Sequence, residues 1–234
     1  MKPTKVDDVI AMVALYRPGP MDFIPSYIRR MHGEEKVDYR HPALEPIFCE
    51  TYGVPVYQEQ VMTAAVQLAG YSAADADYLR KAISKKEAGE LQKHRAKFIE
   101  GAEAKGMPKD TAASIFEDWE NFARYGFNRA HAAAYGTLAA QTAYLKANYP
   151  IEYMVALLSV FRGNADKTAG YIADCRRMGI TVLPPHVSAS AIDFQIERAE
   201  QGGEGIRFGL GAIKNVGDGS ADQTDGKNSR SVRD

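Results

Sequence analysis

Apolar residues recur at helical spacing through the first 180 residues of this chain, and this repeat restricts its fold most. The clearest example is a stripe made of Ala112, Ile115, Phe116, Trp119, Phe122 and Ala123. Apolar residues three and four positions apart lie on one face of a helix, so the stripe predicts an amphipathic helix packed against other helices. The period changes only after Gly179, and we therefore expect a mainly α protein.

Proline and glycine divide this helical region into segments. Residues 17–20 (RPGP), Gly106 and Gly126 each stop the pattern, because proline cannot continue a helix and glycine favours helix ends. Candidate caps open three segments: Thr4 with Asp7, Ser72 with Asp75, and Asn164. The predicted helices span residues 4–16, 24–31, 58–69, 73–86, 87–105, 108–123, 130–148, 150–161 and 164–179, with a loop through residues 41–42.

The last part of the chain follows a different pattern. Residues 194–197 and 206–208 alternate apolar and polar side chains on either side of a glycine-rich turn, which indicates a β-hairpin. From Gly217 onward the residues are small and polar, and this composition is typical of a disordered tail. The sequence thus divides into a helical part, residues 1–180, a short hairpin segment, residues 181–216, and a tail, residues 217–234.

Composition excludes several classes of protein. The chain has 234 residues, 45% of them hydrophobic and 25% charged, as in soluble globular proteins. No apolar run approaches the roughly 20 residues of a membrane helix, and the first residues do not show the apolar stretch expected of a signal peptide. Cys49 and Cys175 have no CxxC spacing, which argues against a disulfide scaffold or a thiolate metal site. We expect both to be buried thiols of a cytoplasmic protein.

The charge is unevenly distributed, although the formal net charge is only −1. Residues 80–109 contain nine basic and four acidic side chains, a local charge of +5. Lys81 and Lys85 lie four residues apart, as do Arg80 and Ser84, so they form adjacent rows on one helix. Such a surface attracts a phosphodiester backbone or a triphosphate. The alternative is a solvated charged face, which the charges alone favour.

A second candidate lies where residues 127–131 (FNRAH) precede a predicted helix. Unpaired N–H groups at a helix N-terminus suit phosphate, and Arg129 and His131 would add donors. An ordinary capped helix with a hydrogen-bonded histidine explains the same residues. Gln58 and Glu59 at another helix start, and Arg17 in its rigid turn, are weaker candidates with structural explanations of their own.

No credible metal site is visible in the sequence. Asp75 and Asp77 are two residues apart on a predicted helix, so their carboxylates point to different sides. The five histidines lack metal-ligand spacing, and there is no Walker motif, GxSxG or HExxH. We therefore expect no metal site within the chain.

Eight segments, taken in order, resemble one known family. They are residues 10–21 (IAMVALYRPGPM), 52–62 (YGVPVYQEQVM), 79–86 (LRKAISKK), 125–135 (YGFNRAHAAAY), 141–150 (QTAYLKANYP), 175–179 (CRRMG), 182–185 (VLPP) and 206–217 (IRFGLGAIKNVG). Each alone is a modest signal, but their common order and spacing are specific. Over residues 1 to about 219 the sequence resembles the alpha subunits of bacterial DNA polymerase III, replicative polymerases of family C.

The resemblance implies that residues 1–180 are most of a helical fingers domain, truncated at its N-terminus. It implies that Arg80, Lys81 and Lys85 face the triphosphate of the incoming dNTP. It also implies that Asn128, Arg129, His131 and Tyr135 line the nascent base pair, with Arg17, Gln58 and Glu59 in supporting positions. Where the family usually has Phe-Asn-Lys-Ser-His, this chain has Arg129 and Ala130, which keeps a charge but removes a hydroxyl.

Other parts of the family are expected outside this sequence. The catalytic aspartates that bind Mg²⁺ belong to a palm domain that precedes it, and the helix-hairpin-helix region, the clamp-binding segment and an OB-fold follow. The resemblance thus implies a fragment of a cytoplasmic DNA-directed DNA polymerase, inactive alone. Its partners would be dNTP, primer-template DNA, the sliding clamp and other replisome subunits, with no membrane.

Two alternatives use the same residues differently. The chain could be a non-catalytic helical module that binds DNA or nucleotides through its basic segment. It could also be a helical scaffold that binds another protein through an exposed apolar face around residues 6–13.

Overall fold

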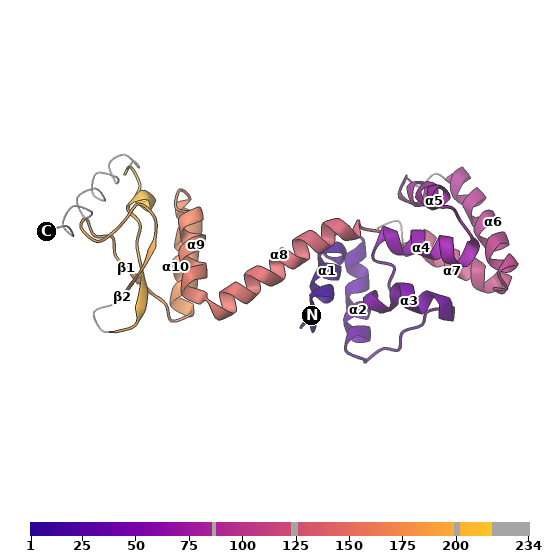
Figure 1. Ribbon diagram of the computed structural model, residues 1–234, viewed down its shortest axis with the longest axis horizontal. Helices are drawn as coiled ribbons and strands as arrows, with labels where there is room; N and C mark the ends of the chain where they lie inside the picture. Colours follow the sequence, from indigo (N-terminus) through magenta and orange to yellow (C-terminus); the bar gives the residue numbers. More distant parts are fainter. Residues whose placement is uncertain (86–87, 123–125, 199–201, 217–234) are drawn as a thin grey trace. The chain divides into compact units, whose positions relative to one another are not determined.

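The computed structural model describes residues 1–85, 88–122, 126–198 and 202–216. Within it the chain forms two compact units, Met1–Ala140 and Gln141–Asp234. The division lies inside one helix (Figure 1), not near residue 180 where the sequence pattern changes. The proposed disordered tail, residues 217–234, lies outside the described residues.

Among the residues of the first unit that the structure describes, every helix or strand element is helical. The helices are α1 (Val6–Leu15), α2 (Ile24–Met31), α3 (Glu45–Phe48), α4 (Gln58–Ala69), α5 (Ala73–Lys85), α6 (Ala88–Ala104), α7 (Lys109–Phe122) and the first part of α8 (Arg129–Asn148), with three 3₁₀ turns, Pro20–Phe23, Pro42–Leu44 and Cys49–Thr51. The predicted bounds of α2 and α4 are confirmed residue for residue. The segment 42–51 was expected to begin as a loop, but it forms short helices that span too few turns to show a period.

The start of α1 differs from the prediction. Lys5 occupies the cap position, and Asp8 rather than Asp7 reaches back to the chain. One carboxylate oxygen of Asp8 accepts hydrogen bonds from the backbone N–H groups of Thr4 and Lys5, at 2.9 and 3.1 Å. The Asp8 side chain is buried, and these bonds lower its pKa against the opposing effect of burial.

The predicted exposed apolar face around residues 6–13 is wrong. Ala11, Ala14 and Leu15 form the buried face of α1, and Ile10 and Val13 pack partly buried against the same cluster. Val6 is the large apolar side chain of this helix that remains exposed, at 47%. A single valine offers little area to a partner, so the scaffold alternative loses its supporting surface.

Two apolar clusters hold the first unit together. In one, α4, α5, α6 and α7 surround Phe98, Phe116 and Trp119, whose ring centroids lie 4.7–6.1 Å apart. The predicted stripe on α7 is confirmed from Ala112 to Trp119, while the side chain of Phe122 and all of Ala123 lie outside the described residues. Fully burying each large apolar side chain contributes roughly 1.5–3 kcal/mol.

The second cluster joins α1 and α2 to residues 54–57 and to Ala132 of α8. Here α8 approaches α1 closely, because Gly136 presents no side chain toward Ile10. This contact and Ala132 fix the first turns of α8 against the helices that precede it.

The second unit packs α9 (Pro150–Val160) and α10 (Ala165–Arg177) against a three-stranded sheet. The predicted hairpin is confirmed as β2 (Gln195–Arg198) and β3 (Glu204–Arg207), which pair antiparallel. A third strand, β1 (Thr181–Leu183), pairs parallel to β3 and was not predicted, because three residues show no alternation. The strand order is β1-β3-β2.

The cap of α10 and the burial of the two cysteines can also be compared with their predictions. The predicted cap of α10 is confirmed, since Asn164 Oδ1 accepts from Lys167 N at 3.0 Å. Cys175 is buried as expected, but Cys49 is exposed at the end of α3, which contradicts the prediction. Among the helices that the structure describes, none is both long and apolar enough to span a membrane. The mainly α fold is confirmed.

Candidate functional site

The basic row of α5 begins with two cations that share one carboxylate. Arg80 Nη2 lies 2.7 Å from Asp77 Oδ1, and Lys81 Nζ lies 2.8 Å from Asp77 Oδ2. The hydrogen bonds from Lys81 and then Arg80 lower the pKa of Asp77, so its charge persists at neutral pH. Lys85 follows, exposed, at the end of the helix.

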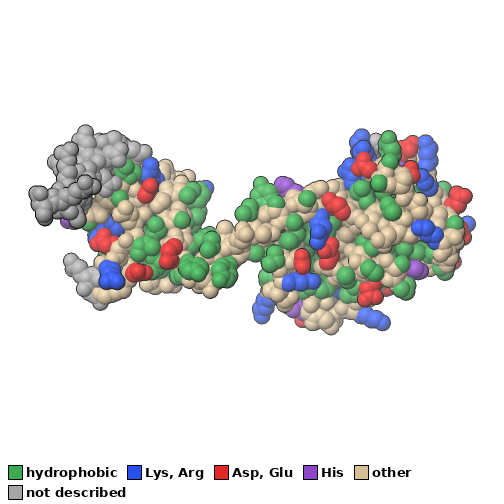
Figure 2. Space-filling view, in the orientation of Figure 1, with side chains coloured by type: hydrophobic (Ala, Val, Ile, Leu, Met, Phe, Trp, Pro, Cys, Tyr) green, Lys and Arg blue, Asp and Glu red, His purple; other side chains and the backbone are tan. Residues whose placement is uncertain are grey.

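Two further basic residues near this row are also paired with carboxylates. Lys93 lies 2.7 Å from Glu90, and Lys97 lies 3.0 Å from Asp75 on α5. Figure 2 shows the blue Lys and Arg side chains beside red Asp and Glu side chains over this part of the first unit. Much of the +5 segment is therefore a solvated face of exposed ion pairs, which add little to stability.

Arg80 is distinguished from the other cations because it also reaches the start of α4. Its Nη1 donates to Gln58 Oε1 at 3.4 Å. The backbone N–H of Gln58 in turn donates to Phe127 O at 3.0 Å, and Phe127 N donates to Val56 O at the same distance. The structure thus connects the basic row of α5 with the start of α8 through the first turn of α4.

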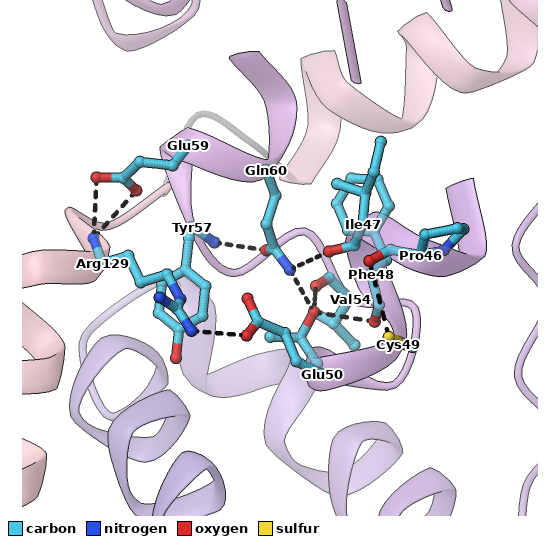
Figure 3. Close-up of polar contacts among 11 residues, drawn as sticks. Pro46, Ile47, Phe48, Cys49, Glu50, Val54, Tyr57, Glu59, Gln60 and Arg129 are labelled. Carbon is cyan, nitrogen blue, oxygen red and sulfur yellow. Dashed lines mark hydrogen bonds and ion pairs between the residues drawn. The ribbon is translucent and has the colours of Figure 1, made fainter. Parts of the chain in front are cut away.

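The carboxylate of Glu59, a residue of α4, lies at the N-terminus of α8 (Figure 3). Its Oε1 accepts from Asn128 Nδ2 at 3.0 Å, and both carboxylate oxygens lie 3.0–3.1 Å from Arg129 N. Asn128 Oδ1 accepts from His131 N at 2.8 Å and so caps the helix. A carboxylate of the chain, rather than an exposed set of amides, therefore meets the partial positive charge that was expected to receive a phosphate.

The side chain of Arg129 is also engaged within the protein. Its Nη2 lies 2.8 Å from Glu50 Oε2, and its guanidinium carbon lies 5.8 Å from the centroid of the Tyr57 ring. The hydrogen bond from Arg129 to Glu50 raises the pKa of the guanidinium. Glu50 and Tyr57 were not predicted as part of the site, because neither carries a local signal in the sequence.

A buried hydrogen-bond network around Gln60 connects the segments that carry Glu50 and Glu59. Gln60, which is 4% exposed, accepts from Tyr57 N at 2.9 Å and donates to Ile47 O and Thr51 Oγ1 at 3.1 and 2.8 Å. The network ties the start of α4 to the 3₁₀ turn that carries Glu50 (Figure 3). Buried polar groups satisfied in this way hold a backbone in one arrangement.

A row of rings runs along the outer side of the same segment. The guanidinium carbon of Arg17 lies 4.6 Å from the centroid of Phe127. The Phe127 and His131 centroids are 5.4 Å apart, and those of His131 and Tyr135 are 4.9 Å apart. Arg17 is thus placed beside the segment it was expected to support, while His131 and Tyr135 are exposed.

The described residues do not form a metal centre. Within residues 1–85, 88–122, 126–198 and 202–216, no three His, Cys, Asp or Glu side chains are placed to hold an ion. The groups brought together at this site are cations, amides, carboxylates and aromatic faces, which can bind and position a ligand.

Comparison with protein families connects this region to a known domain. Residues 1–106 match the bacterial DNA polymerase III alpha subunit finger domain, and residues 179–225 match a helix-hairpin-helix motif. The helix-hairpin-helix region was expected to follow the chain, and no resemblance was expected beyond residue 219. The second match begins at residue 179 and extends to residue 225, so both expectations need correction.

Curated relatives cover nearly the whole chain. The sequence is 54% identical over 226 residues to DNA polymerase III subunit alpha of Thermus aquaticus, and 49% and 45% identical to those of Deinococcus radiodurans and Bacillus subtilis. These matches include 93–94% of this chain but 16–19% of each relative, so the chain spans less than a fifth of their length. Nearly the whole chain is therefore similar to one part of the bacterial DNA polymerase III alpha subunits, and its residues 1–106 match the finger domain of that family.

Proposed function

We propose that this chain is the nucleotide-binding fingers part of a DNA-directed DNA polymerase that acts in DNA replication. The observation that carries the proposal is the contact of Arg80 with Gln58, whose backbone N–H binds Phe127. Through it, the basic row of α5 and the start of α8 belong to one surface of the first unit. The names of the relatives support the same role.

In this role, Arg80, Lys81 and Lys85 bind the triphosphate of the incoming dNTP. Cations directed at the β- and γ-phosphates stabilise the charge that develops on the leaving pyrophosphate. Asp77 holds Arg80 and Lys81 on α5 before the nucleotide arrives. Binding then exchanges a shared carboxylate for phosphate oxygens, so Asp77 competes with the triphosphate for both cations.

The exposed rings of His131 and Tyr135 line the nascent base pair. Their rings lie on one side of α8 with centroids 4.9 Å apart and planes tilted by 49°, so each ring offers an aromatic face on which a base can stack. Ala130 precedes them with no hydroxyl, so contacts to the nucleotide at this position are limited to the backbone and to van der Waals packing.

Catalysis belongs to residues outside this sequence in the proposal. Nucleotidyl transfer with Mg²⁺ requires convergent carboxylates, which the resemblance places in a palm domain. We therefore expect no primer extension by the 234-residue chain with Mg²⁺, dNTP and primer-template DNA. Extension above background would contradict this expectation.

Titration of the chain tests the binding role. We expect dNTP to bind, and Arg80→Ala and Lys85→Ala to weaken binding by roughly tenfold each, as for hydrogen bonds to charged groups. Lys93→Ala is the matched control, because Lys93 lies on α6 in an exposed pair with Glu90. Equal losses in all three variants would show general charge attraction and contradict a specific site.

Primer-template DNA is the second proposed partner, with other replisome subunits and the sliding clamp bound by the complete protein. The match of residues 179–225 to a helix-hairpin-helix motif favours DNA contact by the second unit. It also keeps the alternative of a DNA-binding module open. Binding of DNA that weakens with salt and ignores Arg80→Ala, without dNTP binding, would favour that alternative.

A further inference from the structure

We propose that Glu50 and Glu59 form a clamp on the start of α8, and that Arg129 is a positioning residue rather than a ligand of the nucleotide. This inference deepens the proposed function and rests on it. The clamp joins three segments: the 3₁₀ turn Cys49–Thr51, the first turn of α4 and the first turn of α8.

The two carboxylates hold different parts of the same residue. Glu59 accepts from the backbone N–H of Arg129 with both oxygens, and Glu50 binds its guanidinium at 2.8 Å. Glu59 also holds the side-chain amide of Asn128. Arg129 is therefore fixed at its main chain and at the end of its side chain, which determines where α8 begins.

The charges around Arg129 explain why this residue positions α8 rather than binding a phosphate. A phosphate that approached Arg129 would meet the carboxylates of Glu50 and Glu59 at the same place, and like charges repel. The ring of Tyr57 covers another side of the guanidinium. The guanidinium of Arg129 is half exposed but lies against Glu50 and Tyr57, while His131 and Tyr135, two and six residues further on, are exposed.

The clamp also explains how the two halves of the proposed site keep their spacing. Glu59 follows Gln58, the residue that Arg80 contacts. The first turn of α4 therefore binds α5 through one residue and α8 through the next. Movement of α8 away from Glu59 would separate the exposed rings from the basic row.

Double-mutant analysis of dATP binding by the 234-residue chain distinguishes the two roles of Arg129. If Arg129 positions α8, Arg129→Ala and Glu50→Ala each weaken dATP binding by up to about fivefold, and the double variant is no weaker than the worse single variant. The exchanged pair, Glu50→Arg with Arg129→Glu, restores affinity to within about twofold of the unmodified chain. If Arg129 binds the triphosphate, Glu50→Ala leaves affinity unchanged or higher, and the exchanged pair binds poorly. Either of these results would overturn the proposal.

The pair formed by Arg40 and Asp118 provides a matched control. Its side chains are 49% and 32% exposed, against 48% and 30% for Arg129 and Glu50, and it also joins distant segments of the first unit. Arg40→Ala and Asp118→Ala should leave dATP affinity unchanged. A similar loss in these variants would show that the effect arises from surface ion pairs in general, and would contradict a clamp.

Amide hydrogen exchange separates failure of the clamp from failure of the proposed function. Glu59→Ala should accelerate exchange at Arg129 N by about tenfold, whereas Glu59→Gln, which keeps an acceptor oxygen, should change it less. Chains that bind no dATP at all would contradict the proposed function, and exchange would still decide whether the clamp exists. Unchanged exchange in Glu59→Ala would refute the clamp even if dATP binds.

Discussion

Gly136 of α8 lies directly against Ile10 of α1. A Cβ atom added at residue 136 would come 2.7 Å from Ile10 Cγ1 and 2.8 Å from its Cα, closer than real Cβ atoms approach other heavy atoms. The contact requires glycine for its lack of a side chain. The position of α8, and with it the position of the His131 and Tyr135 rings, therefore depends on glycine at residue 136.

Gly136→Ala should destabilise the first unit. Either α8 or α1 must shift to admit the methyl group, and such overpacking costs about 1–3 kcal/mol of unfolding free energy. Gly170→Ala in α10 is the control, since no atom lies within 4 Å of its added Cβ. There alanine should stabilise by up to about 1 kcal/mol through helix propensity. Urea denaturation measures both, and equal effects would contradict the close approach.

Gln60→Met should lower the free energy of unfolding by about 1–3 kcal/mol, because it leaves the buried partners of Gln60 without their hydrogen bonds. Methionine has a similar volume, so the loss reports the polar network rather than a cavity. Gln67→Met on the exposed face of the same helix should change stability by less than about 0.5 kcal/mol. A near-neutral Gln60→Met would show that the network does not hold the start of α4.

Acid should weaken the end of α2 through Glu35. Hydrogen bonds from Ser26 and Arg30 lower the pKa of this carboxyl from its ordinary value of 4.5 to about 2. A depressed pKa in the folded state contributes stability above pH 4.5 that is lost as the pH falls towards 2. Glu35→Gln should therefore flatten the pH dependence of the urea midpoint between pH 4.5 and 2. An unchanged slope would assign acid sensitivity to other carboxylates.

Asp77→Asn should strengthen dNTP binding if the basic row of α5 receives the triphosphate. The substitution removes the charge that competes with phosphate for Arg80 and Lys81. The expected gain is up to about fivefold, because exposed ion pairs are worth about 0.2–1 kcal/mol. Isothermal titration measures it, and Asp75→Asn, which releases Lys97 instead, is the control. Weaker binding by Asp77→Asn would show that Asp77 orients the cations rather than competing for them.

The sequence predicted the long helices well, because amphipathic period and caps act locally. Gly70 and the cap of Ser72 with Asp75 fix the ends of α4 and α5 within a few residues of the chain. The short helices of residues 42–51 and the strand β1 depend on packing and on a distant partner strand. No local pattern reports such contacts.

The candidate site shows the same division. Residues of the basic row and the start of α8 could be named from their charge and from the family resemblance. Their partners could not, because Glu50 meets Arg129 across 79 residues and Glu59 meets it across 70. The sequence could predict that a negatively charged group lies at the N-terminus of α8. It could not predict that this group is the carboxylate of Glu59 rather than a phosphate.

Primer extension by a chimaeric polymerase tests whether the basic row of α5 binds the incoming dNTP. In it, this chain replaces the 226 matching residues of the Thermus aquaticus subunit, to which it is 54% identical. We predict that the chimaera extends a primer, and that Arg80→Ala raises KM for dNTP by about tenfold or more while KM for primer-template DNA stays unchanged. An active chimaera whose KM for dNTP is unaffected by Arg80→Ala would contradict this prediction.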